Sequence, residues 1–196
     1  MKIPIWSVED VRRKVGFALI ESGISMLDLP KDLEFSLRSA LNAAKLNLEG
    51  EIQTFKISHE ELEKLVKSKS PQTQCIFWDR NFWYPRLEDW KKFITEDLVN
   101  FLRYKLDHFD CDNFSTTFKA HIAEYYGING IGVALGALYK DDQLLGYHSY
   151  NILLAREEEK NKLICYEPQT DEQKDFEYEV KMSTGVVYRT DLILWY

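Results

Sequence analysis

The stretch DHFDCDNFSTTFKAHIAEYY, residues 107–126, places Cys111 between two aspartates, directly before an amphipathic run. Asp110 is the expected N-cap of a helix, where its side chain accepts a hydrogen bond from the amide of Asn113. Cys111 then falls in the first turn, where the helix dipole favours a thiolate against the repulsion of Asp110 and Asp112. Apolar residues at helical spacing predict that this helix packs on a sheet: Phe114, Phe118, Ile122 and Tyr125.

The patterns on the two sides of this stretch differ. Before it, the chain reads as mostly helical, with helices expected at 7–22, 30–48, 58–68 and 85–106, the last broken near Thr95, and a short strand at 50–57. Ser58 and Glu61 have the spacing of a capping box. After it, β-like runs at 129–140, 144–156, 162–168, 175–181 and 185–196 are separated by turn signals. The order of elements therefore predicts an α+β fold with an antiparallel sheet.

Composition excludes several classes of protein. The net charge of -7 over 196 residues, with no basic cluster, argues against nucleic-acid binding. The longest apolar stretch, 128–139, is far shorter than the roughly 20 residues of a membrane span. The N-terminus has charges where a signal peptide is apolar, so we expect a cytoplasmic protein. Three cysteines without a C-x-x-C pair predict neither a disulfide framework nor a zinc site, and we expect Cys75 and Cys165 to be small buried hydrophobes.

Two residues of the β-rich half offer partners for the cysteine. His148, in GYHSYNILL, is the only histidine there, and Glu167, in LICYEPQTDE, stands at a strand end a hairpin away. Thiolate, imidazole and carboxylate together make a nucleophile, a base and a group that orients the base. This order of elements and residues is the one that a papain-type thiol hydrolase needs. His108, three residues before Cys111, is a rival cation, and His121 is expected to face solvent.

The motifs FDCDNF, GYHSYN and YEPQTDE, in this order, resemble the papain-like agglutinin C-terminal family, the domain of Marasmius oreades agglutinin and its prokaryotic and phage relatives. The likeness covers roughly residues 83–196. It implies a papain-like core at 76–196, with Cys111, His148 and Glu167 as a catalytic triad and Gln169 shaping the site. Residues 1–75 are then a mostly helical N-terminal region of unknown role.

The resulting hypothesis is a cysteine hydrolase, a thiol protease or amidohydrolase that cleaves a peptide or amide substrate through a thioester. No cofactor and no metal are assigned, and no nucleic acid or membrane partner is expected. One alternative is a catalytically inactive papain-like binding or structural module, favoured because RYKLDHF lacks the glutamine that supplies an oxyanion donor in papain-like enzymes. A second is an acyltransferase with the same residues. Binding of a divalent cation by Asp110 and Asp112 is also open, since the resemblance implies a link to calcium.

Overall fold

The computed structural model describes residues 19–31, 33–34, 37–38, 41, 52–97 and 99–196. The chain divides into two compact units, Met1–Glu51 and Ile52–Tyr196. In the first unit residues 19–26 are helical, as are the described residues between 31 and 41. Helices were expected at 7–22 and 30–48, so the first of them extends four residues further than predicted. The rest of the predictions for residues 1–51 lie outside the described residues. The boundary expected between residues 75 and 76 falls inside a strand of the second unit.

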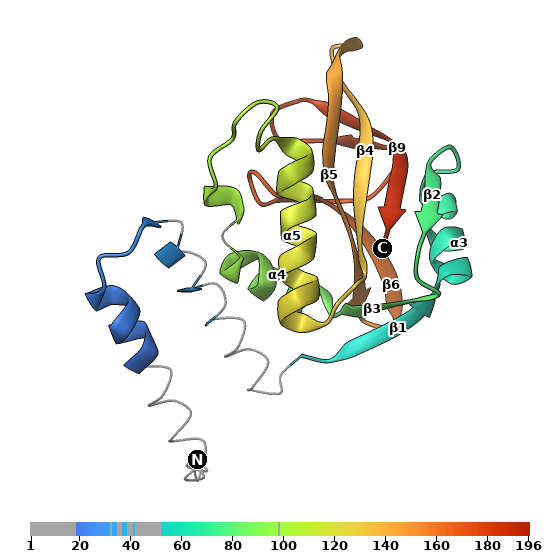
Figure 1. The fold of residues 1–196 in the computed structure, drawn as a ribbon. Coiled ribbons are helices and arrows are strands. Elements are labelled where there is room, and N and C mark those ends of the chain that lie inside the picture. The colour runs from blue at the N-terminus through green and yellow to red at the C-terminus, as the bar shows by residue number, and fades with distance from the viewer. Residues whose placement is uncertain (1–18, 32, 35–36, 39–40, 42–51, 98) are drawn as a thin grey trace, which may run out of the picture. The chain divides into compact units, whose positions relative to one another are not determined.

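The second unit is built on a seven-stranded mixed sheet in the order β2-β9-β4-β5-β6-β7, with β8 paired to β9 (Figure 1). Only β2 and β9 run parallel; the other neighbours are antiparallel. The strands are β2 (Gln74–Phe77), β4 (Ile131–Lys140), β5 (Gln143–Glu157), β6 (Lys160–Glu167), β7 (Glu172–Asp175), β8 (Glu179–Lys181) and β9 (Val187–Trp195). The expected α+β class is confirmed.

A separate ribbon and three α-helices complete this unit. The ribbon pairs β1 (Thr54–Ser58) with β3 (Asn81–Pro85). The α-helices are α3 (His59–Lys69), α4 (Leu87–Glu96) and α5 (Cys111–Tyr126), and a short 3-10 helix, η1, covers Val99–Phe101. The capping box of Ser58 and Glu61 starts α3 as predicted. The break expected near Thr95 in the helix at 85–106 is present, since α4 ends at Glu96. Between the break and residue 106 the described residues form the short 3-10 helix η1 and no second α-helix.

The sequence missed two strands, β2 and β3, inside the part that it read as mostly helical. The aromatic residues on and around these two strands divide into a buried set and an exposed set. Phe82 and Tyr84 are buried in the main core, whereas Trp78 and Trp83 are exposed. The run at 175–181 is likewise strand only from Glu179, while β7 ends where that run begins.

Alternating residues of β5 point to the two opposite faces of the sheet. Tyr150, Ile152 and Leu154 belong to the hydrophobic core that also takes in α3 and β3. Ser149 and Asn151 point to the opposite face, where both contact Ser115 of α5. The cysteine-bearing helix α5 therefore lies on β5 and β4, across the sheet from that core (Figure 1). No helix among the described residues is long and apolar enough to cross a membrane.

Candidate functional site

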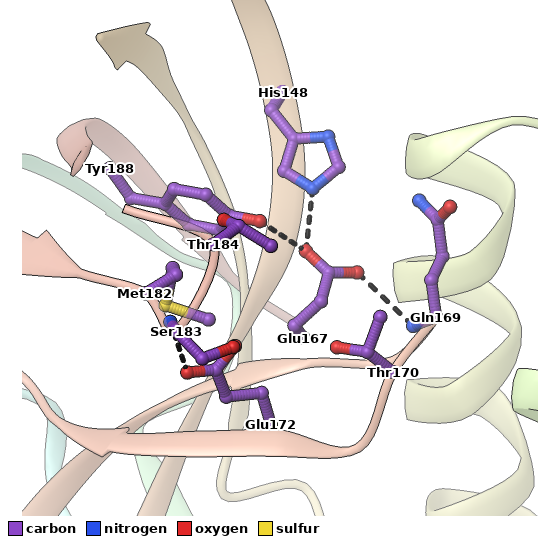
Figure 2. Close-up of a pocket in the computed structure, with 9 residues that line it drawn as sticks. All are labelled: His148, Glu167, Gln169, Thr170, Glu172, Met182, Ser183, Thr184 and Tyr188. Atoms are coloured by element: carbon purple, nitrogen blue, oxygen red, sulfur yellow. Dashed lines mark hydrogen bonds and ion pairs between the residues drawn. The ribbon is translucent and has the colours of Figure 1, made fainter. Parts of the chain in front are cut away.

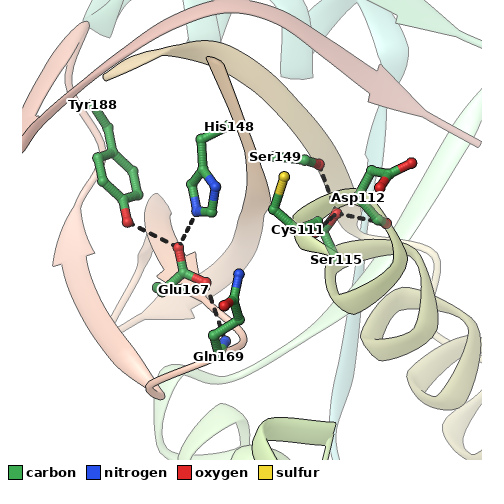
Figure 3. Close-up of polar contacts among 8 residues, drawn as sticks. All are labelled: Cys111, Asp112, Ser115, His148, Ser149, Glu167, Gln169 and Tyr188. Carbon is green, nitrogen blue, oxygen red and sulfur yellow. Dashed lines mark hydrogen bonds and ion pairs between the residues drawn. The ribbon is translucent and has the colours of Figure 1, made fainter. Parts of the chain in front are cut away.

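Cys111 is the first residue of α5, where the sequence placed it. Asp110 is the N-cap, and its backbone amide donates a hydrogen bond of 3.1 Å to Oδ1 of Asn113, which closes a capping box. The thiol is half-buried. The N-cap fixes where α5 begins and therefore the direction of the Cys111 side chain in the first turn, where backbone amides have no partner within the helix. The thiol points toward the sheet (Figure 3).

His148 is held on β5 just beyond the point where the neighbouring strand ends. β5 and β6 pair from Glu157 back to Asn151, whose partner is Tyr166. The edge of β5 before Asn151 is therefore open on that side, and α5 begins there. Period-two alternation places His148 on the same face of the sheet as Tyr150 and as Glu167, the residue after Tyr166. The register thus brings histidine and glutamate together across the end of β6.

Glu167 accepts three hydrogen bonds. Its Oε2 lies 2.6 Å from Nε2 of His148 and accepts a bond of 2.9 Å from the Tyr188 hydroxyl. Its Oε1 accepts a bond of 3.1 Å from the backbone amide of Gln169 (Figure 2). The glutamate is almost fully buried, at 3% exposure. A buried carboxylate with this many donors is a fixed acceptor, and it sets the orientation of the imidazole.

The Cys111 sulfur lies on the other side of the imidazole, facing the second ring nitrogen (Figure 3). A hydrogen bond with His148, helped by one from the Ser149 backbone amide, lowers the pKa of the Cys111 thiol, although burial and Asp110 oppose this. Burial also acts against a charged His148, but hydrogen bonds with Cys111 and Glu167 raise the pKa of its imidazole to about 9. The two shifts together favour a thiolate and an imidazolium near neutral pH.

A buried pair of serines ties the start of α5 to the histidine strand. The hydroxyls of Ser115 and Ser149 share a hydrogen bond of 2.6 Å, and Ser115 also donates to the Cys111 carbonyl at 3.0 Å. Nδ2 of Asn151 donates to the Ser115 carbonyl, again at 3.0 Å. These contacts hold the helix that carries Cys111 against the strand that carries His148, and so set the separation of sulfur and ring.

Two cavities meet at His148. The thiol-side cavity, of about 440 Å³, is lined by Asp110, Cys111, Asp112, Leu135, Gly136, Tyr147, His148, Ser149 and Asp191. The glutamate-side cavity, of about 360 Å³, is lined by His148, Glu167, Gln169, Thr170, Glu172, Met182, Ser183, Thr184 and Tyr188 (Figure 2). A ligand that spans both would lie across the imidazole.

The two aspartates beside the thiol interact with each other. A shared hydrogen bond lowers the pKa of Asp110 and raises that of Asp112. Ligand atoms of Asp110, Cys111 and Asp112 all lie within 4.8 Å of one another, close enough to bind one metal ion together. Carboxylate oxygens suit calcium and a thiolate suits softer metals, so this donor set is mixed.

The remaining histidines and cysteines differ in part from expectation. His121 was expected to face solvent, which is wrong: its Nδ1 lies 2.8 Å from Oδ2 of the buried Asp97. His108 is exposed, and His148, not the rival His108, hydrogen-bonds Cys111. Cys165 is buried as expected, whereas Cys75 is only partly buried. Burial raises the pKa of the Cys75 thiol to about 11.

Sequence reasoning missed the residues that hold the cluster in place: Ser115, Ser149, Asn151 and Tyr188. One signal was available for Ser149 and Asn151, since both are polar positions within an otherwise apolar strand. Buried polar residues on a strand need partners on the layer above it. Tyr188 gave no such signal. It lies on β9, where its register partner is Leu138 of β4, and it reaches Glu167 only because several strands are aligned in the sheet.

Comparisons with known proteins identify the type of domain. Residues 89–173 match the family model described as agglutinin C-terminal. No curated protein sequence matches the chain. A solved structure titled "PSL1a-E64 complex" is similar over 71% of this chain and 51% of its own, with 17% identity and a TM-score of 0.53. A Polyporus squamosus lectin, bound in its structure to the epitope Neu5Aca2-6Galb1-4GlcNAc, is similar over 71% and 49%, with 17% identity and a TM-score of 0.51.

These findings correct one prediction and confirm another. The prediction of a thiol protease with a catalytic triad is wrong, because the family match indicates an agglutinin C-terminal domain over residues 89–173. The chain spans about half the length of both structures, and identity at this level shows a shared fold alone. The resemblance to the agglutinin C-terminal family is confirmed over residues 89–173, the part of the chain that the family model matches.

Proposed function

We propose that this chain is a binding module that keeps a papain-like arrangement of helix and sheet, with the cleft around His148 as its ligand site. One observation carries the proposal: two cavities of about 440 and 360 Å³ meet at a partly buried imidazole that is held by Glu167. Preformed concave sites with a few oriented polar groups are typical of ligand binding. The ligand class that suits this cleft best is a peptide, a chain long enough to occupy both cavities.

A binding role fits the donors around the thiol better than turnover does. The Cys111 backbone amide lies at the helix start and supplies one oxyanion donor. Among the described residues, no side-chain amide lines the thiol-side cavity. Loss of one such donor lowers acyl-transfer rates by roughly a hundredfold to a thousandfold. The three-residue cluster would then hold and orient a ligand more effectively than it would cleave one.

Retention of a peptide library tests the proposal. Purified protein is passed over immobilised acetylated tetrapeptide amides, and the retained protein and the peptide masses are both measured. We expect a subset of peptides to retain the protein without change of mass, and His148→Ala to lose that retention. His108→Ala is the matched control, since His108 is exposed and outside both cavities. The trisaccharide named for the Polyporus squamosus lectin, immobilised in the same way, tests whether the module instead binds glycans.

Two outcomes would overturn the binding proposal. Equal retention of the parent protein and His148→Ala would mean that the cleft is not the binding site. Steady cleavage of peptides that stops in Cys111→Ala would mean that turnover, not binding, is the activity. Retention of the glycan alone would assign the module another ligand class.

A second candidate, transfer of an acyl group through Cys111, is favoured by the opposite pKa shifts of Cys111 and His148. The thiolate would add to the carbonyl carbon of an acyl donor, and the imidazolium would give its proton to the leaving group. An amine would then add to the thioester carbonyl and give its proton to the neutral imidazole, which releases the acyl group as an amide and regenerates the thiolate and the imidazolium. Incubation with p-nitrophenyl acetate should add one acetyl group to Cys111 by mass, and glycine amide should remove it. A protein that stays unmodified at Cys111 would exclude this candidate.

A further inference from the structure

The two cavities beside His148 differ in chemistry. The glutamate-side cavity is rich in hydroxyl and amide groups, among them Thr170, Ser183 and Gln169. The thiol-side cavity combines apolar surface with carboxylates and has Ser149 as its one uncharged hydroxyl outside Tyr147. A ligand that crosses the imidazole therefore meets different surroundings on each side. The thiol-side cavity is the one that pairs exposed apolar side chains with three aspartates.

The apolar wall of the thiol-side cavity comes from β4 and β5. Leu135 is 37% exposed and faces the cavity, and its register partner on β5 is Ser149. Tyr147, at 77% exposure, stands at the rim. Gly136, next to Leu135 on β4, adds no side chain to the cavity. Exposed apolar side chains suit an aliphatic chain laid against them.

The charge of this cavity comes from Asp110, Asp112 and Asp191, which reach it from two elements of the fold. Asp110 and Asp112 stand at the start of α5, and Asp191 lies on β9. None of the ion pairs found among the described residues uses these three carboxylates. His148, the cation at the edge of the cavity, is already bonded to Glu167. The cavity thus has negative charge that the described fold leaves unbalanced.

We propose that the thiol-side cavity takes a lysine or arginine side chain of the peptide ligand. The aliphatic stem would lie on Leu135 and Tyr147, and the cationic end would reach Asp191 and the two aspartates of the helix start. A peptide carbonyl next to that side chain would then lie at Cys111. The inference rests on the proposed peptide-binding function and adds the ligand's chemical class to it.

Protection of Cys111 from alkylation tests this specificity. The rate of labelling by iodoacetamide at about pH 7 is followed by mass spectrometry with increasing acetyl-Ala-Xaa-Ala-amide, where Xaa is lysine, arginine, norleucine or glutamate. The readout is the peptide concentration that halves the labelling rate. We expect lysine and arginine to need about fivefold less peptide than norleucine, the ratio for an ion pair of about 1 kcal/mol, and glutamate to need more.

Two variants with the same charge change separate a local from a long-range effect. Asp191→Asn should remove most of the preference for lysine over norleucine. Glu159→Gln, at a carboxylate that is 95% exposed on the β5–β6 turn, should leave that preference intact. The preference should also weaken as salt is raised, since a partly exposed ion pair is screened.

The outcomes distinguish this inference from the proposed function. No protection by any peptide would mean that the peptide-binding proposal itself fails. Equal protection by lysine and norleucine, or a preference unchanged in Asp191→Asn, would overturn the basic-side-chain inference and leave peptide binding in place. Calcium chloride that binds in an Asp191-dependent manner and abolishes the preference, with reversal by a chelator, would assign these carboxylates to a metal and also overturn the inference.

Discussion

The hydroxyl of Tyr188 donates a 2.9 Å hydrogen bond to Oε2 of Glu167, the oxygen that also meets the imidazole. Both residues are buried. Tyr188→Phe keeps the ring but leaves a buried carboxylate oxygen with one donor fewer, so we expect a loss of about 1 to 3 kcal/mol in the free energy of unfolding. Urea unfolding measures it. Tyr147→Phe, which removes a hydroxyl from an exposed ring, should change stability far less; an equal loss in both would show that the Tyr188 bond is not the cause.

Alkylation of the three cysteines should depend on pH in different ways. The lowered pKa of Cys111 keeps thiolate present below the usual range, so iodoacetamide should label it at about pH 6. Cys75 and Cys165 should label slowly, because burial raises the pKa of both thiols. His148→Ala should slow labelling of Cys111 sharply, and Glu167→Gln should slow it less. Uniform labelling of all three cysteines, read by peptide mass spectrometry, would contradict an activated Cys111.

The serine pair should show strong coupling in a double-mutant cycle. Ser115→Ala or Ser149→Ala alone leaves the other buried hydroxyl without this partner, at a cost of about 1 to 3 kcal/mol in the free energy of unfolding. The double variant removes both hydroxyls, so its loss should be smaller than the sum of the single losses. Labelling of Cys111 should fall in all three, since one of the bonds that tie the helix start to β5 is lost while the Asn151 bond remains. Strict additivity in urea unfolding would argue against a direct bond.

His121 and Asp97 give a stability difference with a definite sign. The hydrogen bond with Asp97 raises the pKa of His121, despite partial burial. The folded state therefore holds the His121 proton more tightly than the unfolded chain does. The stability that this hydrogen bond adds is fully present below the unfolded pKa of about 6.5, and it is lost as the pH rises through the pKa of His121 in the folded state. His121→Asn should lower the melting temperature more at about pH 6 than at about pH 9. The corresponding difference in the free energy of unfolding should be on the order of 1 kcal/mol. His59→Asn, at a more exposed histidine, is the control; a His121 difference that grows with pH would contradict this sign.

The sequence predicted the parts of this fold that have strong local signals. The helix from Cys111 to Tyr126 follows from its N-cap and apolar spacing, and β4 to β6 follow from long alternating runs with clear turns. The turn between β4 and β5 is the one that Asp141 and Asp142 indicated, and both adopt positive φ. β2 and β3 have four and five residues, too few for period to separate strand from helix.

The residues of the candidate site were likewise predictable only where they lie on elements with a strong sequence pattern. Cys111, His148 and Glu167 come together as the sequence anticipated, because each lies at the end or edge of an element with a strong pattern. Asp97 could not be matched with His121 beforehand, since it lies after α4 and meets α5 only through tertiary packing. The expectation of a protease failed for another reason: the residue types of a cluster fix its geometry and charge more closely than its biological role.

The position of β9 has a consequence for synthesis on the ribosome. This strand lies between β2 and β4 in the sheet, although it is the last described strand along the chain. A nascent chain that has emerged only as far as β7 has β4, β5 and β6, but its β2 has no partner and Glu167 lacks the Tyr188 hydroxyl. The long-range contacts that complete the sheet must wait for β9, so Glu167 gains its Tyr188 donor only after that strand has emerged.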